Sequence, residues 1–156
     1  MIRPVQPTDA GAWLALRLAL WPDEDPAALA ADVARFFAEP GTGPGVMPEE
    51  VFVATLPDSE HGRLAGFAEV SRRLYAEGCV SSPVGFLEGW YVSPEHRQQG
   101  IGRALVEAGQ SWARDLGCRE FASDALADNL VSAWAHRALG FEEVEVIRCF
   151  RKELNP

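Results

Sequence analysis

An apolar strand, followed at once by a glycine-containing turn and a helix, lies in the second half of the chain. Residues 86–92 (Phe-Leu-Glu-Gly-Trp-Tyr-Val) are mostly apolar or aromatic, as a buried strand requires. Pro94 ends the strand, because proline has no amide to donate to a sheet ladder. Gly100 and Gly102 then open an amphipathic helix, whose apolar positions are Leu105, Ala108, Trp112 and Leu116.

The turn between strand and helix is a candidate anion site. Two glycines let the backbone approach a ligand closely, and the amides of a first helical turn bind anions. On its own, Gly100-x-Gly102 is equally consistent with a flexible turn. The stretch lacks the Lys-[Ser/Thr] of a nucleoside-triphosphate loop and the Gly-x-Gly-x-x-Gly of a dinucleotide site, which argues against both.

Composition bounds the class of protein. The 156 residues, 47% hydrophobic and 24% charged, are typical of one soluble globular domain, here 1–156. No apolar run approaches the roughly 20 residues that span a bilayer, and no signal peptide opens the chain. Three scattered cysteines without a Cys-x-x-Cys predict reduced thiols, no metal site and a cytoplasmic protein. The net charge of −9 disfavours nucleic-acid and membrane partners and favours cationic ones, although solubility alone would explain it.

The remaining segments predict further strands and helices. We expect strands at 2–5, 51–56, 64–70, 118–125 and 141–151, and helices at 9–20, 26–38 and 129–139. Thr8 is the expected N-cap of the first helix, Asp25 that of the second, and Asp128 or Asn129 that of the last. Residues 40–45 are expected to form a loop, and His61 to decorate a hairpin turn.

The turn carries a family resemblance. Arg97-x-x-Gly100-x-Gly102, five residues after a strand ending Tyr-Val, resembles the acetyl-CoA pyrophosphate loop of the GNAT (GCN5-related) N-acetyltransferases. The order β-α-α-β-β-β-α-β-α-β matches their plan. The resemblance implies an α+β (mixed α/β) fold, in which a mostly antiparallel sheet is splayed into a V between its two central strands and flanked by helices.

The same resemblance implies how acetyl-CoA is held. The backbone of the splayed strand would pair with the pantetheine arm, and the Val92 amide would face the thioester oxygen. Asn129 stands where the family often has an asparagine that contacts the pantetheine. The implied cofactor-binding residues are Trp90, Tyr91, Val92, Gln98, Gln99, Gly100, Ile101, Gly102, Arg103 and Asn129.

One position departs from the family pattern. Many members have a tyrosine, acting as general acid near the sulfur, where this chain has His136. An imidazole, with a reference pKa near 6.5, suits proton transfer at neutral pH. His136 is equally consistent with a packed residue beside the cofactor, and a thiolate can leave without a general acid.

Two carboxylates are candidates for the acceptor side. Glu88 interrupts an apolar strand, where burial would be costly unless the side chain were paired or faced a polar cleft. Asp124 ends the next strand on the splayed side, so we expect the two to converge; its alternative role is to cap the following turn. Paired acids can bind an ammonium group or relay its proton.

Longer segments are similar to one subgroup, the aminoglycoside 6′-N-acetyltransferases. They are Leu20-Trp21-Pro22, 75–89, 117–124 and 136–143. This resemblance implies an acceptor site lined by Trp21, Tyr75, Glu88, Asp124 and Glu145, with Glu88 and Asp124 nearest the reacting amine. The region of Glu24 matches poorly. Members are commonly dimers, so a homodimer is implied.

The sequence therefore predicts direct acetyl transfer from acetyl-CoA to the 6′-amine of an aminoglycoside. No cysteine has a helix-start or histidine-adjacent context that would favour an acetyl-enzyme. An N-acetyltransferase acting on another small-molecule or protein amine is an alternative. A second alternative is an acetyl-CoA-binding module without catalysis, which would release no thiol with any amine.

Overall fold

The computed structural model describes residues 1–38, 47, 49–57 and 63–154. These divide into two compact units, 1–124 and 125–156, and each is described by itself. The predicted loop 40–45 and the turn position of His61 lie outside the described residues.

The first unit is built on a five-stranded sheet with the order β1-β2-β3-β4-β5. The strands are β1 (Ile2–Pro4), β2 (Glu49–Thr55), β3 (Leu64–Arg73), β4 (Val84–Val92) and β5 (Phe121–Ser123). Neighbours are antiparallel except for β4 and β5, which are parallel. The mixed, mostly antiparallel sheet predicted from the sequence is confirmed. β5 pairs only with Gly85–Leu87, so residues 88–92 of β4 run on beyond it, where the sequence predicts the splay.

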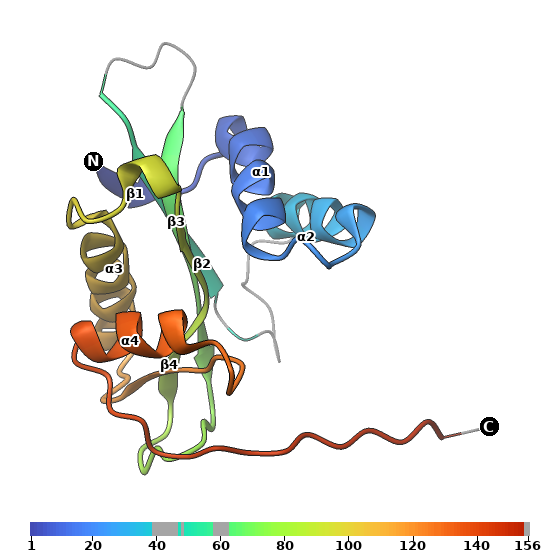
Figure 1. Ribbon diagram of the computed structural model, residues 1–156, viewed down its shortest axis with the longest axis vertical. Coiled ribbons are helices and arrows are strands. Elements are labelled where there is room, and N and C mark those ends of the chain that lie inside the picture. Colours follow the sequence, from blue (N-terminus) through green and yellow to red (C-terminus); the bar gives the residue numbers. More distant parts are fainter. Residues whose placement is uncertain (39–46, 48, 58–62, 155–156) are drawn as a thin grey trace. The chain divides into compact units, whose positions relative to one another are not determined.

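Helices cover both faces of this sheet (Figure 1). α1 (Ala10–Leu20) and α2 (Pro26–Ala38) lie on one face and α3 (Ile101–Asp115) on the other. Under α1 and α2 the core contains Trp13, Leu16, Val33, Val53 and Phe67. α3 places the fully buried Leu105 and Val106 on its apolar side. The predicted start of α2 is confirmed, since the Asp25 carboxylate accepts the Ala27 amide at 3.0 Å ahead of a proline at the first position.

The start of α1 differs from its prediction. A single 3₁₀ turn, Pro7–Asp9, precedes the helix, so Thr8 lies inside that turn and is not the N-cap. Asp9 is buried instead, and its carboxylate accepts the Gln6 amide at 2.8 Å. Arg3 adds two contacts to the same carboxylate, at 2.6 and 3.0 Å. A charge-assisted pair of this kind outweighs the single hydrogen bond that a threonine cap supplies.

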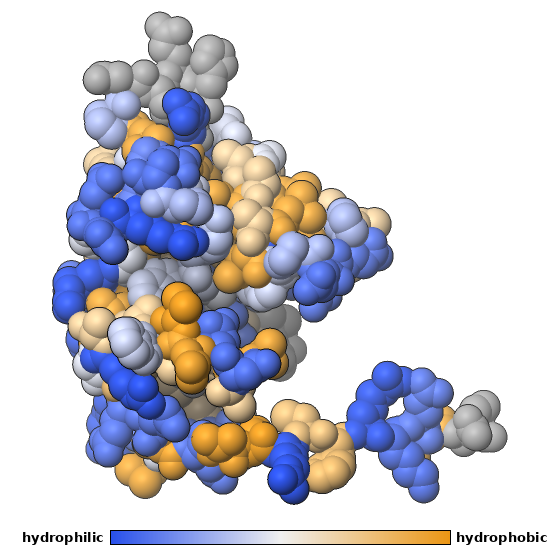
Figure 2. All heavy atoms as spheres, viewed as in Figure 1, coloured by the Kyte–Doolittle hydropathy of each residue, from blue (hydrophilic) through white to orange (hydrophobic). Residues whose placement is uncertain are grey.

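The second unit contains α4 (Leu130–Ala138). Asn129 is its N-cap, with Oδ1 accepting the Ser132 amide at 3.0 Å. Gly140, with φ of +88°, ends it. The strand predicted at 141–151 is wrong, because residues 141–154 carry no regular secondary structure. Their apolar side chains stand exposed (Figure 2), with Phe150 at 92% and Val146 at 70%. Alternation alone does not make a strand, which needs a ladder partner, and none is registered among the described residues.

The strand predicted at 118–125 is confirmed over a shorter range. Cys118 follows the end of α3 and is buried, while only Phe121–Ser123 joins the ladder. Gly117, with φ of +80°, separates it from α3. None of the described helices has both the length and the apolar composition needed to cross a bilayer.

Candidate active site

Glu88 lies at a β-bulge in the middle of β4. Glu69 of β3 pairs with Gly89 and Val70 pairs with Leu87, which leaves Glu88 without an opposite residue. A bulge turns one side chain out of the regular alternation, and bulges are common next to active sites. Glu88 is exposed between buried neighbours. The bulge therefore explains how an otherwise apolar strand carries an ionisable side chain.

The Glu88 carboxylate is held by two groups of β3. Arg73 contacts it through Nη2 at 2.6 Å and Nε at 2.9 Å, and Ser71 donates a hydroxyl at 2.5 Å. The Arg73 guanidinium also lies over the Phe86 ring at 3.5 Å. Arg73 was not predicted from the sequence, although its position near the end of β3, opposite Val84, would be a signal once the register is known. Glu88 is a fixed carboxylate whose charge is shared with an arginine.

Asp124 follows β5 directly, next to this bulge. Leu87 and Ser123 are the last registered pair of the two parallel strands, so Glu88 and Asp124 are the next residues on each. Both are exposed, and Ser123 Oγ donates to the Leu87 carbonyl at 3.2 Å. The structure thus brings the two predicted carboxylates to the point where β4 and β5 separate.

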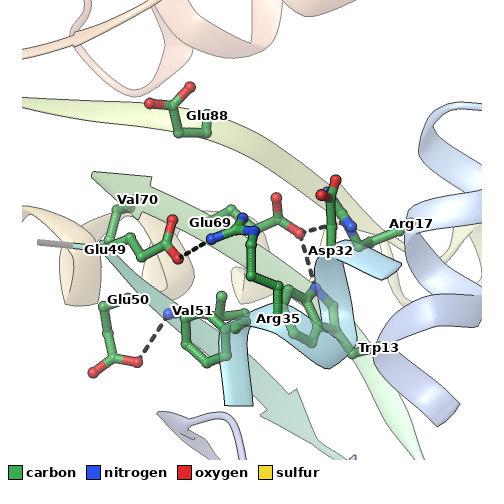
Figure 3. A pocket seen from close by; sticks show the side chains of 11 residues that line it. Trp13, Arg17, Asp32, Arg35, Glu49, Glu50, Val51, Glu69, Val70 and Glu88 are labelled. Atoms are coloured by element: carbon green, nitrogen blue, oxygen red, sulfur yellow. Dashed lines mark hydrogen bonds and ion pairs between the residues drawn. The ribbon is translucent and has the colours of Figure 1, made fainter. Parts of the chain in front are cut away.

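Glu88 also lines a small pocket of about 60 Å³ under α1 and α2 (Figure 3). The volume suits an ammonium group or a few waters, not a sugar ring. Its charged lining residues are Asp32, Glu49, Glu50, Glu69 and Glu88, against Arg17 and Arg35. The pocket is acidic partly because of three residues that were not predicted from the sequence, Glu49, Glu50 and Glu69.

Burial sets the protonation of two of these acids. Desolvation raises the pKa of Glu69 to about 7, although Arg17 and the Trp13 indole N–H both favour its carboxylate form. Desolvation also raises the pKa of Glu50, opposed by a hydrogen bond from the Val51 amide. Glu69 is therefore placed to exchange a proton near neutral pH.

Trp21 packs against β4 beside Glu88. It caps the C-terminus of α1, and a Cβ atom added at Gly89 would lie 2.7 Å from its ring atom Cη2. Its ring also meets Phe67 edge-on at 6.3 Å. Glycine at position 89 thus provides the space that the indole fills. Tyr75, by contrast, lies just after β3, is 66% exposed and does not line the described pocket.

The end of β4 presents backbone groups on the side away from β3. The Ser93 amide donates to the Ala65 carbonyl at 2.8 Å, which makes these two a hydrogen-bonded pair. Bonded and non-bonded pairs alternate in antiparallel sheets. The amides of Trp90 and Val92 therefore point away from β3, and that of Tyr91 toward it. Arg97 Nε reaches the Val92 carbonyl at 2.9 Å on the outward side.

The turn before α3 has the geometry of an anion-binding loop. Gln98 and Gly100, with φ of 60° and 80°, adopt the left-handed conformation, and Gly100 is the N-cap of α3. Successive amides in such a turn converge on one point, where the helix dipole adds positive potential. Gly102 serves a different purpose, since a Cβ there would lie 2.8 Å from Trp90 Cζ2. The Trp90 indole of β4 thus packs against the first turn of α3 at Gly102.

Comparison with known proteins gives the family. A model described as the acetyltransferase (GNAT) family matches residues 13–141. The chain belongs to the GNAT acetyltransferase family. It is 48% identical to the aminoglycoside N(6′)-acetyltransferase type 1 of Klebsiella aerogenes, over 99% of this chain and 97% of the relative. It is 47% identical to the protein of that name from Stenotrophomonas maltophilia, over 99% and 94%.

Solved structures of GNAT enzymes agree in fold. The structure of AAC(6′)-Iy in complex with the bisubstrate analogue CoA-S-monomethyl-acetylneamine matches with a TM-score of 0.86 and 38% identity, over 99% of this chain and 98% of that one. AAC(6′)-IG from Acinetobacter haemolyticus matches with a TM-score of 0.86 and 35% identity, over 99% of both chains. The GNAT fold and the subgroup resemblance predicted from the sequence are confirmed.

The second unit of this GNAT protein carries three of the predicted site residues. His136 is half-buried in α4, where Nδ1 lies 2.7 Å from the Ser132 carbonyl and the ring meets Phe141 edge-on at 5.2 Å. A carbonyl only accepts hydrogen bonds, so Nδ1 is the donor in this contact. Asn129 uses Oδ1 as the α4 cap, and Glu145 is exposed in the segment 141–154.

The cysteines offer no activated nucleophile in the first unit. Burial raises the pKa of the Cys79 thiol, and nearby Glu120 raises it further. Burial likewise raises the pKa of Cys118. Raised pKa values disfavour the thiolate, the form that attacks an acyl group. No group of three or more His, Cys, Asp or Glu side chains is placed to hold a metal ion within the described parts of the chain.

Proposed function

We propose that this protein is an aminoglycoside 6′-N-acetyltransferase that uses acetyl-CoA. The carrying observation is the position of Glu88 and Asp124, which follow the last registered pair of β4 and β5 where the strands separate. The relatives named aminoglycoside N(6′)-acetyltransferase, matched over nearly their full length, support the choice of acceptor. We also propose that the whole chain acts as one acetyltransferase domain, because the family match spans parts of both units.

The residues of the β4–α3 junction fit the coenzyme. The backbone of Trp90 and Val92 faces away from β3 and is available to an extended pantetheine arm, with Tyr91 between them. Amides from Gln98 to Arg103, at a turn with left-handed residues, suit a pyrophosphate. Asn129 keeps its amide N–H groups for a pantetheine carbonyl while its oxygen caps α4. When bound, acetyl-CoA supplies the activated acetyl group.

The two carboxylates have different parts in the proposed mechanism. Glu88, fixed by Arg73, holds the 6′-ammonium group in place, and Asp124 accepts its proton. The neutral nitrogen then forms its bond to the acetyl carbon while the carbon–sulfur bond breaks, the sulfur keeps the electron pair, and the nitrogen gives up its second proton to water. The Val92 amide stabilises the charge that develops on the acetyl oxygen. His136 Nε2 is the proposed donor of a proton to the leaving thiolate.

The acceptor is a polycation, and the cleft suits one. Trp21 offers an aromatic wall beside Glu88, and we propose that Tyr75 and Glu145 contact the outer rings of the aminoglycoside. The acids lining the pocket outnumber its arginines. A net charge of −9 adds long-range attraction.

Thiol release from acetyl-CoA tests this function. We expect release with kanamycin A and none with its 6′-hydroxyl analogue, because only the amine can be acetylated at that position. Polyamines and a lysine peptide serve as the alternative acceptors. Thiol release with those acceptors and not with kanamycin A would assign the enzyme to another amine. Binding of acetyl-CoA without thiol release for any amine would indicate a binding module without catalysis.

We propose a cytoplasmic homodimer. The described cysteines form no disulfide, which supports a reducing compartment. Residues 141–154 are acidic first (Glu142, Glu143, Glu145) and basic later (Arg148, Arg151, Lys152). Antiparallel pairing with a second copy, centred on Ile147, would set Glu142 opposite Lys152, Glu143 opposite Arg151 and the exposed Val144 opposite Phe150.

Sedimentation equilibrium tests the dimer. Ile147→Asp should give a monomer, because two carboxylates would face each other at the centre of the pairing. Val80→Asp, at a 97% exposed position of the first unit, should leave the dimer intact. A wild-type protein that sediments as a monomer would contradict the proposal.

A further inference from the structure

Arg17 is a buried cation between two indole rings. It lies in α1 with 8% of its surface exposed, and its guanidinium carbon is 5.6 Å from the Trp13 ring centroid and 5.2 Å from that of Trp21. Nη1 donates to the Leu29 carbonyl at 3.0 Å, and Nη2 lies 3.5 Å from Asp32. Burying a charge is costly unless it is paired and hydrogen-bonded, so this arrangement fixes the guanidinium tightly.

Glu69, on strand β3 of the sheet, contacts the Arg17 guanidinium. Its Oε1 is 2.9 Å from Arg17 Nε and accepts the Trp13 indole N–H at 2.9 Å (Figure 3). In the β3–β4 register Glu69 stands opposite Gly89, the residue against which Trp21 packs. The cross-strand pair of Glu69 and Gly89 lies next to the Glu88 bulge. Glu69 contacts the Arg17 guanidinium, and Gly89 packs against the Trp21 indole.

We propose that the Arg17–Glu69 ion pair positions Trp21 as the aromatic wall of the acceptor site. The inference rests on the proposed function, in which Trp21 contacts the aminoglycoside next to Glu88. Arg17 and Glu69 are positioning residues, because they act through Trp21. The planar guanidinium suits this task, since it can lie against aromatic rings while its edge donates hydrogen bonds, which the ammonium group of a lysine cannot do.

Quenching of tryptophan fluorescence by acrylamide tests the positioning without any ligand. Arg17→Lys keeps the charge but loses the flat contact with the indoles, so the quenching constant should rise. The rise should be smaller when Arg17→Lys is made in a Trp21→Phe background. Arg35→Lys is the matched control, because Arg35 lines the same pocket but pairs with Glu49 at 3.2 Å. Equal quenching in Arg17→Lys and wild type would overturn the proposal.

Steady-state kinetics tests the link to the acceptor. Arg17→Lys should raise the KM for kanamycin A about tenfold, with the KM for acetyl-CoA unchanged. Tenfold is the factor expected when a cation–π contact of about 1.4 kcal/mol between Trp21 and the substrate is lost. Arg114→Lys, exposed on α3, should change neither constant. A general structural defect would instead raise both KM values or lower kcat alone, and that result would overturn the proposal.

The dependence of the acceptor KM on pH distinguishes the charge of Glu69 from its hydrogen-bonding geometry. The groups facing Glu69 are Arg17, Asp32, Arg35, Glu49, Glu50 and Glu88. As pH falls through about 7, Glu69 takes up a proton and loses its attraction for Arg17, so the acceptor KM of wild type should rise. Glu69→Gln, which keeps the hydrogen-bonding shape, should abolish that step. Profiles that are parallel in the two proteins would refute the proposal. A wild type inactive on every 6′-amine would refute the proposed function, and the quenching result would still decide whether Arg17 positions Trp21.

Discussion

Asp124 and Glu88 are both acids at the point where β4 and β5 separate, yet their surroundings differ. Glu88 is tied to Arg73 and Ser71, whereas Asp124 is exposed directly after β5. The contacts with Arg73 and Ser71 fix the Glu88 carboxylate in one position, whereas the exposed Asp124 carboxylate is accessible to an approaching ammonium group. At the residue scale we therefore propose that Asp124 accepts the proton and that Glu88 orients the amine.

Substitution of the two acids should separate these roles. Asp124→Asn should lower kcat by about a hundredfold, the lower end of the effect of a general base, with little change in the KM for acetyl-CoA. Glu88→Gln should mainly raise the acceptor KM, because it removes a charge that binds the ammonium group. Initial rates of thiol release over a range of concentrations of both substrates give kcat and each KM. A Glu88→Gln enzyme that loses kcat while Asp124→Asn keeps it would reverse the assignment.

Asp9 makes a prediction about stability. Arg3 holds the pKa of the Asp9 carboxyl below its usual value of 3.8, so the folded protein favours the ionised form. The stabilisation is fully present above about pH 4 and is lost as pH falls through the lowered value. Asp9→Asn should reduce the free energy of unfolding by about 2 kcal/mol at neutral pH and by much less near pH 2. Urea unfolding at the two pH values measures this, with the exposed Asp23→Asn as a control that should change neither.

At the scale of elements, the junction of β4 and α3 depends on one glycine. A methyl group at Gly102 would come within 2.8 Å of the Trp90 indole, so either the ring or the first turn of α3 has to shift. Gly102→Ala should therefore weaken acetyl-CoA binding several-fold, as seen by calorimetry, even though alanine favours helix. Gly11→Ala, with no atom within 4 Å of the added carbon, is the matched control and should stabilise the protein by about 0.5–1 kcal/mol. Equal coenzyme affinity in both variants would contradict this account of the junction.

Local patterns predicted most elements correctly because each has its own signal. The Asp25-Pro26 start of α2 and the Asn129 cap of α4 are each set by two or three residues that are adjacent in the sequence. Features that depend on distant partners were not predictable in the same way. The Glu88 bulge follows from the register with β3, and the burial of Asp9 follows from Arg3 in another element.

The predicted strand at 141–151 shows the limit of periodicity. Its alternating side chains satisfy the pattern, but the described residues hold no ladder partner for it. The candidate site divides in the same way. Glu88 and Asp124 were predictable from an acid in an apolar strand and an acid at a strand end, whereas Arg17, Glu69 and Arg73 emerge only once the helices and strands are packed.

At the scale of the whole molecule, charge governs encounter with the substrate. The protein carries a net charge of −9 and the proposed acceptor is a polycation. The value of kcat/KM for kanamycin A should therefore fall as salt is raised from about 0.05 to 0.5 M, because salt screens the attraction between exposed charges. The kcat value should change much less. A kcat/KM that does not respond to salt would mean that long-range attraction has no part in binding.

The position of the acetyl group in the product tests the central claim most directly. Kanamycin A carries several amines, and in the proposed mechanism only the 6′-amine lies between Glu88, Asp124 and the end of β4. Two-dimensional NMR of the product should show a single amide at the 6′-nitrogen, with the other amines unmodified. Acetylation of a different amine, or a mixture of positions, would contradict the proposed site.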